Sequence, residues 1–442
     1  MPTPLYDALR AYAARNPARF HMPGHSGRFL PGPELAPLLP LDVTEVPGTG
    51  NLYEAGEPFD AAQALWARAF AFDHCQFLTG GSTMGLHTGL ALLAAPGSAV
   101  LVDRGCHHSV FHAMALLDLR PVYLERPWRS GENLSGPFSP EQVAAALEKH
   151  PEIKTVCITS PTYSGVLSDI PAIAREIHAR GGRLLVDGAH GAHLPFLGVD
   201  AFGGADCVVV SAHKTLPALG QGAMLFTRGT DPGEVRRMAA VFGTSSPSYP
   251  VMASMDLARD WLEGEGREAL EGTARRVAEL RKKFSSLHPG PGLALDPCRL
   301  TLKVKDGPSF ARALEARGVF PEMEDGGHVV FICTPCHRAE DLARLEGALE
   351  ELAGGLGDCP PLPPPPISRM VLTPRQALFA PAETLPLEAC LGRVSAGQLA
   401  PYPPGVPVVA PGEAVGKKEL SYFREIGYNN PSVAVVSGQT PL

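Results

Sequence analysis

Short apolar runs alternate with helical patterns over much of the first half of the chain, between about residues 75 and 228. The runs are rich in valine, leucine and isoleucine on consecutive positions, which is typical of strands buried on both faces. We predict strands at residues 99–102, 155–159, 184–187, 207–211 and 223–227, and helices at residues 84–93, 140–149 and 170–179. Strands joined by helices in this rhythm predict an α/β fold with a mostly parallel sheet covered by helices.

The remaining sequence divides into further predicted parts. Residues 1–50 form an N-terminal segment, and residues 51–287 the large domain, whose last helix is a charged stretch at 267–283. A smaller α/β domain follows at 288–357. Six prolines between Cys359 and Pro366 predict an extended linker over 358–367. Residues 368–442 then form a C-terminal domain.

Composition excludes several classes of protein. Hydrophobic residues make up 45% of the 442 residues, as in a globular protein. The net charge is −8, and the sequence contains no cluster of lysine and arginine that would bind nucleic acid. No apolar stretch is long enough to predict a membrane span, and the first ten residues do not resemble a secretion signal. The nine scattered cysteines fit reduced thiols better than a disulfide framework. We therefore expect a cytoplasmic protein.

Cys333-Thr334-Pro335-Cys336-His337 matches the attachment pattern of c-type haem. Covalent haem attachment normally requires an exported protein, and a match this short arises easily by chance. We therefore predict neither haem nor a metal site.

The ligands of a parallel sheet bind at the carboxyl ends of its strands, which directs attention to the residues after each run. Ser211-Ala212-His213-Lys214 follows the fourth predicted strand. A lysine just past a buried strand is well placed to form an imine with an aldehyde cofactor. Taken alone, the same lysine could lie on a surface loop.

Asp187 ends the preceding predicted strand, in Val186-Asp187-Gly188-Ala189-His190-Gly191. The cofactor pyridoxal 5'-phosphate (PLP) accepts electrons only while its pyridine nitrogen is protonated, and a fixed carboxylate beside that nitrogen raises its pKa. The other interpretation is an aspartate that caps a helix.

Two further segments fit the same cofactor. Thr79-Gly80-Gly81-Ser82-Thr83-Met84-Gly85 opens a predicted helix, where free N–H groups and hydroxyls can bind a phosphate. Asp103-Arg104-Gly105-Cys106-His107-His108-Ser109 follows another strand, and an imidazole there could stack on the ring. Each feature alone is weak. Four of them in order, each at a strand end, predict a PLP site.

With these residues, the chain resembles the Orn/Lys/Arg decarboxylase family of PLP enzymes, which has the type I (aspartate aminotransferase-like) fold. The resemblance begins at residues 3–6 and 20–25, continues through 42–45, and ends at 402–407 and 411–413. The N-terminal wing domain that some members of the family have is not expected in this chain.

The resemblance implies a role for each candidate residue. Lys214 would hold PLP as a Schiff base, Asp187 would contact the pyridine nitrogen, and His107 would stack on the ring. His213 would lie beside the reacting end of the substrate. Thr244 would reach the phosphate of the PLP that is bound in the neighbouring subunit. The other residues implied to contact the cofactor are Gly81, Ser82, Thr83, His190 and Ser211.

The implied reaction is decarboxylation of arginine, lysine or ornithine to the corresponding amine, as in polyamine biosynthesis, by a homodimer or larger homo-oligomer with shared active sites. Glu322 and Asp325 would bind the cationic end of the substrate, although a solvated acidic loop is an equal interpretation. The chain departs from the family pattern at Ser26, Asn51, Gly105, His108 and His190, which leaves the substrate open.

Two alternatives remain. Another PLP reaction, transamination or β-elimination, could use an arginine of the small domain to bind the substrate carboxylate, and the chain offers Arg299, Arg312, Arg317 and Arg338. A catalytically silent homologue is the second alternative, but such a protein is expected to lack the lysine or the aspartate.

Overall fold

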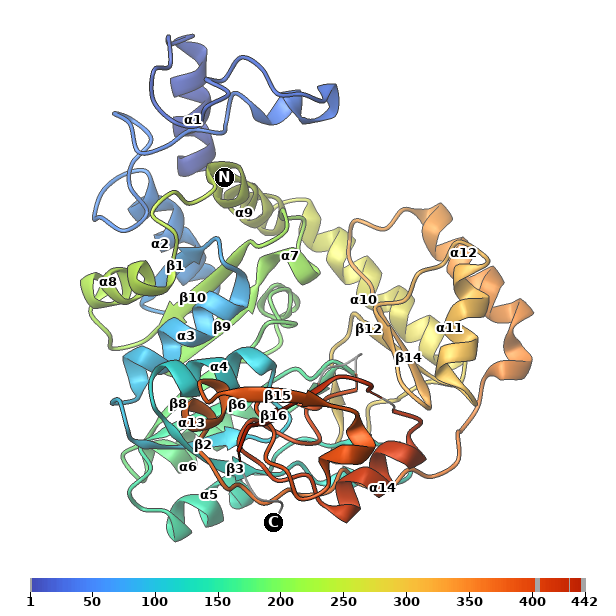
Figure 1. Cartoon of the computed structure of the whole chain (residues 1–442). Coiled ribbons are helices and arrows are strands. Elements are labelled where there is room, and N and C mark those ends of the chain that lie inside the picture. Colours follow the sequence, from blue (N-terminus) through green and yellow to red (C-terminus); the bar gives the residue numbers. More distant parts are fainter. Residues whose placement is uncertain (1, 402–405, 429, 439–442) are drawn as a thin grey trace. The chain divides into compact units, whose positions relative to one another are not determined.

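The computed structural model describes residues 2–401, 406–428 and 430–438 (Figure 1). The predicted closing motif at 402–407 therefore lies largely outside the described residues. The chain divides into two compact units. The first contains residues 1–92, 185–273 and 334–336, and the second contains residues 93–184, 274–333 and 337–442.

The main sheet has seven strands in the order β1-β10-β9-β8-β6-β2-β3. The strands are β1 (His74–Leu78), β2 (Ala99–Asp103), β3 (Arg120–Leu124), β6 (Thr155–Thr159), β8 (Arg183–Asp187), β9 (Cys207–Ser211) and β10 (Ala223–Thr227). β8 runs parallel to β9, and β2 runs parallel to β6 and β3. β10 is antiparallel to both of its neighbours. The mostly parallel sheet confirms the predicted fold class, and all five predicted strands are present.

The described residues of the first unit form seven α-helices, the last of which continues into the second unit. They are α1 (Pro4–Ala14), α2 (Phe59–Ala69), α3 (Gly81–Leu93), α7 (Ala212–Thr215), α8 (Pro232–Phe242), α9 (Tyr249–Glu263) and α10 (Gly266–Lys283). Short 3-10 turns lie at Pro33–Leu38 and Leu194–Leu197. The buried carboxylate of Asp256 accepts hydrogen bonds from the backbone N–H groups of Leu5 and Tyr6. α9 thereby satisfies the first turn of α1, whose N–H groups have no partner within the helix.

α3 lies close to the sheet because two of its glycines, Gly85 and Gly89, face the strands. A Cβ atom on Gly85 would lie 2.6 Å from Cγ1 of Val209 and 2.8 Å from Cδ1 of Leu78. One turn later, a Cβ atom on Gly89 would lie 2.9 Å from Cδ1 of Leu185. Glycines four residues apart share one helix face, so this face packs directly on β1, β8 and β9. The close packing fixes where the first turn of α3 begins.

Substitution of Gly85 by alanine is therefore expected to destabilise the protein, although alanine normally favours a helix. Forcing a methyl group into this contact should lower the free energy of unfolding by about 1–3 kcal/mol. Gly347 of α12 (Ala339–Glu351) offers the control, because a Cβ atom there meets nothing within 4 Å. Gly347→Ala should stabilise by up to about 1 kcal/mol. Urea unfolding of both variants measures the two signs, and a stable Gly85→Ala protein would contradict the packing.

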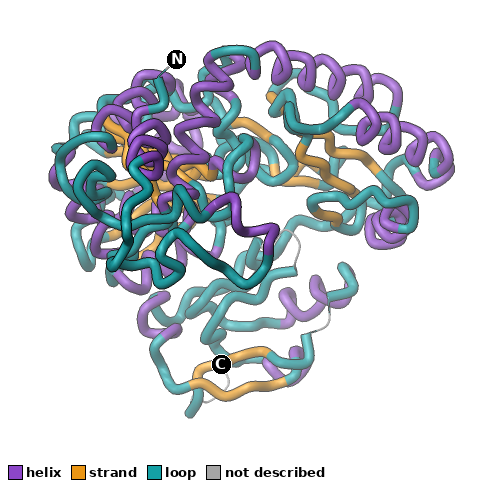
Figure 2. The backbone as a smooth tube through the Cα atoms, turned by 90° about the horizontal axis from the view of Figure 1, so that it is seen from above, coloured by secondary structure: helices purple, strands orange, loops and turns teal. Residues whose placement is uncertain are grey.

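The second unit holds the remaining elements. Figure 2 shows the helices, strands and loops of the described chain by colour. Its other α-helices are α4 (His108–Leu116), α5 (Pro140–Lys149), α6 (Ile170–His178), α11 (Gly307–Glu315), α13 (Pro374–Leu378) and α14 (Lys417–Glu425), with 3-10 turns at Ala353–Gly355 and Leu387–Cys390. Its short strands pair as β4 (Trp128–Arg129) with β5 (Leu134–Ser135), β7 (Val166–Leu167) with β11 (Ala294–Leu295), and β15 (Ala382–Leu385) with β16 (Val433–Val436). The predicted helices at 140–149 and 170–179 are present.

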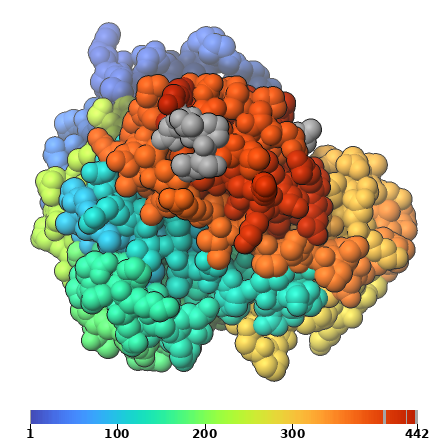
Figure 3. Space-filling model, turned by 60° about the horizontal axis from the view of Figure 1, so that its bottom comes forward, coloured from blue at the N-terminus to red at the C-terminus, as the bar shows by residue number. Residues whose placement is uncertain are grey.

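Several separate apolar cores lie within the described residues of the second unit, and two of them are larger than the others. β12 (Arg299–Lys303), β14 (His328–Ile332) and β13 (Met323–Glu324) form a small antiparallel sheet in that order, and its core includes Leu302 and Val329. The C-terminal residues form another core around Phe423. In Figure 3 the orange and red C-terminal residues lie against teal residues of the same unit.

Residues 359–366 form no helix or strand, in agreement with the prolines there. The exact domain boundaries given above stay predictions. Among the described residues, no helix is both long enough and apolar enough to cross a membrane.

Candidate active site

Lys214 lies just beyond the carboxyl end of β9. All five residues of β9 are buried, and the chain then turns into the single-turn helix α7, which carries Lys214. Nζ of Lys214 lies 3.0 Å from Nε2 of His190. His190 is buried and stands three residues after β8. An amine and an imidazole at this distance share a hydrogen bond, so His190 orients the lysine amine.

Asp187 is the last residue of β8 and is 2% exposed. It pairs in register with Val209 of β9 and accepts a hydrogen bond from the N–H of Ala189 at 3.2 Å. Asp187 and Lys214 therefore leave neighbouring strand ends within one compact unit, as the sequence predicted. Gly188, directly after Asp187, is required by packing within the protein, because a Cβ atom there would lie 2.6 Å from the ring of Phe202.

The first turn of α3 offers an anion site. Gly81 has φ +68°, and its Cβ position faces open space. Its N–H donates to the carbonyl of Gln221 at 3.0 Å, which ties the turn to the residues before β10. Ser82 and Thr83 follow in the first turn, where N–H groups have no acceptor within a helix and the helix dipole favours negative charge. This is the geometry that binds phosphate.

Two buried hydroxyls point to the same conclusion. Oγ of Ser211 and Oγ1 of Thr79 are both buried, and within the described part of the chain neither has a hydrogen-bond partner. Leu78, Ala223 and Ser211 form one row across β1, β10 and β9, so both hydroxyls lie at the same edge of the sheet. A buried polar group without a partner costs about 1–3 kcal/mol, which favours a bound ligand that supplies the partner. These hydroxyls and the α3 turn fit a phosphate group.

Substitution of Ser211 by alanine should therefore have opposite effects on the empty and the loaded protein. Removal of the unpartnered hydroxyl should leave the cofactor-free protein as stable or slightly more stable. Loss of a hydrogen bond to a charged phosphate should weaken cofactor binding about tenfold or more. Thermal unfolding without cofactor and titration with PLP measure the two effects. Unchanged PLP affinity would show that the hydroxyl does not contact the phosphate.

His213 has a defined proton position. Its Nδ1 lies 2.9 Å from the carbonyl oxygen of Gly222, and because a carbonyl can only accept, Nδ1 carries a proton. The half-buried ring therefore presents Nε2 as its remaining nitrogen. The sequence placed Thr79 at the start of the predicted phosphate-binding turn, but it did not indicate Tyr53, whose buried hydroxyl also lacks a partner among the described residues.

His107 lies in the second unit, directly before α4. Its Nδ1 lies 2.8 Å from Oγ of Ser109 and accepts from the backbone N–H of the same residue, so His107 caps the helix. Its ring is 3.8 Å from that of His108, centroid to centroid. Stacking of His107 on a cofactor stays a prediction.

The three other predicted residues lie in loops. Thr244 is exposed in the loop between α8 and α9, and its hydroxyl accepts from the N–H of Ser246. Glu322 is exposed just before β13. Asp325 accepts hydrogen bonds from the N–H groups of Gly327 and His328 and from Nδ1 of His328. Burial raises the pKa of Asp325, but the hydrogen bonds from His328 outweigh it and hold the pKa below its usual value.

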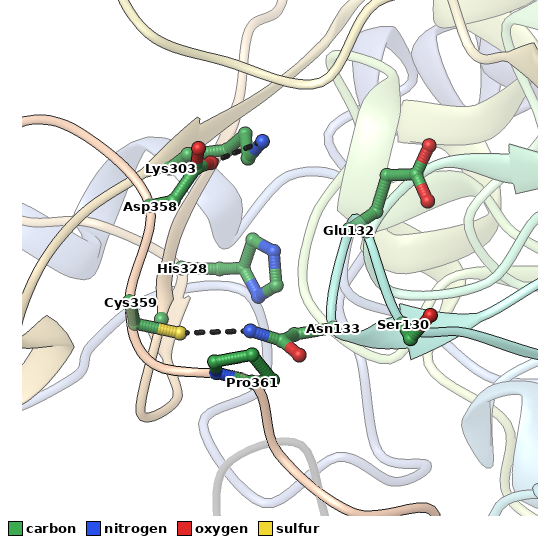
Figure 4. Close-up of a pocket in the computed structure, with 10 residues that line it drawn as sticks. Ser130, Glu132, Asn133, Lys303, His328, Asp358, Cys359 and Pro361 are labelled. Atoms are coloured by element: carbon green, nitrogen blue, oxygen red, sulfur yellow. Dashed lines mark hydrogen bonds and ion pairs between the residues drawn. The ribbon is translucent and has the colours of Figure 1, made fainter.

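A cavity of about 290 Å³ lies in the second unit, between the loop that joins β4 to β5 and the start of the proline-rich linker (Figure 4). Nδ2 of Asn133 donates to Sγ of Cys359 across it, and Lys303 pairs with Asp358. His328, the partner of Asp325, contributes one wall. None of the predicted site residues lines this cavity.

Comparison with known proteins bears on the chemistry. Residues 3–305 match the family model described as Orn/Lys/Arg decarboxylase, major domain, and residues 367–430 match the one described as Orn/Lys/Arg decarboxylase, C-terminal domain. The chain is 33% identical to a Bacillus subtilis protein named YaaO, described as uncharacterized, over 95% of this chain and 93% of that protein. It is 29% identical to a B. subtilis arginine decarboxylase, again over 95% and 93%.

More distant similarity extends to lysine decarboxylases. The constitutive lysine decarboxylase of Escherichia coli is 25% identical over 94% of this chain and 76% of that protein. In structure, the chain is similar to the lysine decarboxylase LdcF of Francisella novicida, with a TM-score of 0.84 at 20% identity, over 98% of this chain and 80% of that one. This structural likeness bears on the fold alone.

Proposed function

The chain belongs to the Orn/Lys/Arg decarboxylase family, and we propose that it decarboxylates arginine with PLP held on Lys214. Members of this family are PLP-dependent enzymes that remove the α-carboxyl group of a basic amino acid. The observation that carries the residue assignment is local. Lys214, Asp187 and the unpartnered hydroxyl of Ser211 all stand at the carboxyl ends of β8 and β9, within one compact unit.

The residues present fit each part of PLP. Ser82, Thr83 and Ser211 would hold its phosphate, and Asp187 would face its pyridine nitrogen. Lys214 supplies the amine that reacts with the aldehyde. When bound, PLP withdraws the electron pair that stays on the α-carbon as carbon dioxide departs.

The side chains of the protein then have distinct tasks. Asp187, buried and negatively charged, would keep a proton on the pyridine nitrogen. His190 would orient Nζ of Lys214 and exchange a proton with it. Two groups can return a proton to the α-carbon, namely Nζ of Lys214 and Nε2 of His213. The low exposure of Asp187 and Ser211 keeps water away from these charges, which strengthens their electrostatic effect.

Arginine is proposed because four relatives described as arginine decarboxylases are 28–29% identical over at least 95% of this chain. The lysine decarboxylases are 24–25% identical. Glu322 and Asp325 would bind the guanidinium of the substrate. Glu322 is exposed, and Asp325 keeps its negative charge because its pKa is lowered.

The aminotransferase alternative receives little support from the arginines of the small domain. Arg317 pairs with Glu351 and Arg338 pairs with Asp341. Arg299 is buried, 3.9 Å from a carboxylate oxygen of Asp296. Binding a substrate carboxylate would require each of these three arginines to leave a carboxylate neighbour. Arg312, the fourth predicted arginine, donates to Oγ of Ser309 instead and keeps this alternative open.

We also propose that the chain acts as a homodimer, in which Thr244 reaches the phosphate in the partner's site. The exposed hydroxyl of Thr244 is compatible with such a contact. The molar mass of the protein, measured by light scattering as it elutes from a size-exclusion column, tests the assembly. A monomer that retains full activity would contradict it.

Incubation of PLP-loaded protein with arginine, lysine, ornithine and leucine tests the function. Equal amounts of carbon dioxide and amine from arginine are expected, with slower release from lysine and none from leucine. Release from lysine alone would keep the reaction but overturn the substrate. An absorbance change without carbon dioxide would overturn the reaction while the cofactor assignment stands.

A further inference from the structure

We propose that His108 and His112 of α4 together bind one transition-metal dication of the kind that imidazole ligands prefer, such as Zn²⁺, Ni²⁺ or Cu²⁺. The two histidines are four residues apart in the helix, and residues at this spacing lie next to each other on one face. The same spacing supplies two zinc ligands in the His-Glu-x-x-His motif of metalloproteases. The site lies within α4 alone and does not depend on the proposed function.

The two imidazoles lie on the outward face of α4 (Figure 1). His108 is half-buried, His112 is exposed, and Leu116, one turn further along the same face, is also exposed. The opposite face consists of buried residues, namely Ser109, Val110, Phe111, Ala113, Met114 and Ala115. The histidine pair therefore faces solvent, from which an ion can reach it.

The separation of the two rings fits chelation of a single ion. Their centroids are 5.2 Å apart, and their planes are inclined at 52°. A Zn²⁺ ion lies about 2.0–2.1 Å from each imidazole nitrogen and prefers roughly tetrahedral angles, so two rings on one ion have centroids roughly 5 Å apart. The helix thus already holds the rings at the distance that a shared ion requires.

The ring nitrogens of this pair are not engaged elsewhere. Among the described residues, neither imidazole has a hydrogen bond or an ion pair, and the contacts of His108 are with the rings of His107 and His112. Other exposed histidines differ in this respect, since Nδ1 of His150 lies 3.4 Å from a carboxylate oxygen of Glu152. The lone pairs of His108 and His112 are therefore available to a metal.

The protonation of the two rings supports the same conclusion. A metal binds the neutral imidazole, because metal and proton compete for one lone pair. Partial loss of hydrating water lowers the pKa of both imidazoles, and the neighbouring His112 lowers the pKa of His108 further. Both rings are therefore neutral at neutral pH to a larger extent than free histidine is.

This pair is separate from the Cys333–His337 motif, from which the sequence predicted no metal site. The helix at residues 108–116 was not among the predicted helices, so the sequence did not show that His108 and His112 share a face. His108 is also one of the positions at which the chain departs from the family pattern. The structure therefore adds the spacing to a residue that the family resemblance left without a role.

Titration calorimetry with NiCl₂ on the full-length, PLP-loaded protein without an affinity tag tests the inference. One Ni²⁺ per chain is expected. His108→Asn and His112→Asn should each weaken Ni²⁺ binding at least about tenfold, because loss of even an outer partner of a metal ligand costs about 10–100-fold. Cu²⁺ should bind more tightly than Ni²⁺, and Mn²⁺ more weakly. With Cu²⁺, electron paramagnetic resonance should show splitting from two imidazole nitrogens, and from fewer in each variant.

His150→Asn and Cys336→Ser are the matched controls, because they remove an exposed imidazole outside the pair and an exposed thiol. Both should bind Ni²⁺ as the wild type does, and so should the cofactor-free protein, whatever reaction the enzyme catalyses. A wild-type protein that does not bind Ni²⁺ would overturn the inference. Unchanged binding in both histidine variants, or an equal loss in either control, would also overturn it.

Discussion

Substitution of Lys214 by alanine is expected to remove decarboxylase activity almost completely, with kcat lowered by on the order of 10⁴-fold. Lys214 is the lysine at the end of β9, and its amine lies 3.0 Å from His190. Without it, PLP has no amine to bond, and one of the two groups that can return a proton to the α-carbon is lost. The absorbance near the visible edge that belongs to PLP bonded to the lysine should disappear.

Lys214→Arg separates charge from reactivity, because arginine keeps the positive charge but its guanidinium stays protonated and does not form an imine with the aldehyde. It should be nearly as inactive as the alanine variant. PLP should still associate weakly with both variants through the phosphate contacts at Ser82, Thr83 and Ser211. Retained carbon dioxide release from either variant would show that another lysine holds the cofactor.

Substitution of Asp187 by asparagine should lower kcat by about 10²–10³-fold, since a carboxylate that stabilises charge in a water-poor site is removed. The amide has nearly the same shape, so cofactor binding should suffer much less than turnover. Asp187 is 2% exposed, which makes its charge effective at short range. Single-turnover release of carbon dioxide from loaded protein measures this step without the influence of product release.

Asp256→Asn is the matched control for this prediction. Asp256 is equally buried but accepts hydrogen bonds from the start of α1. Its loss should lower stability while kcat per loaded enzyme stays unchanged. Equal losses of kcat in the two variants would mean that Asp187 acts through the fold, not through the pyridine nitrogen.

The hydrophobic pattern predicted the central strands because each is buried over nearly its whole length. It missed β1, where His74 and Gln76 interrupt the apolar run, although Gln76 is fully buried in the structure. It also missed β3, which contains Pro121. β3 lies at the edge of the sheet, where a residue without an N–H is tolerated. β1 and β3 form strands because β10 and β2 pair with them. The hydrophobic pattern of a single sequence does not show which strands pair.

The candidate site was predictable to the extent that its residues follow strands in sequence. Lys214, Asp187 and Ser211 are of this kind, and the family resemblance assigned their roles. Thr79 was part of the predicted phosphate-binding turn, although β1, the strand that leads to it, was missed. The engagement of Asp325 by His328 depends on a turn whose geometry is not encoded in any short motif. The buried ion pair of Arg104 and Glu413 joins residues more than 300 positions apart, which no local pattern predicts.

Borohydride reduction of the PLP-loaded protein, followed by digestion and mass spectrometry, tests the central claim most directly. Reduction makes the bond between cofactor and lysine permanent, so the labelled peptide identifies the residue. The structure and the family assignment predict a single pyridoxyl group on Lys214, in smaller amount when excess arginine is present during reduction. A label on a different lysine, or no label on a protein that releases carbon dioxide, would contradict the account.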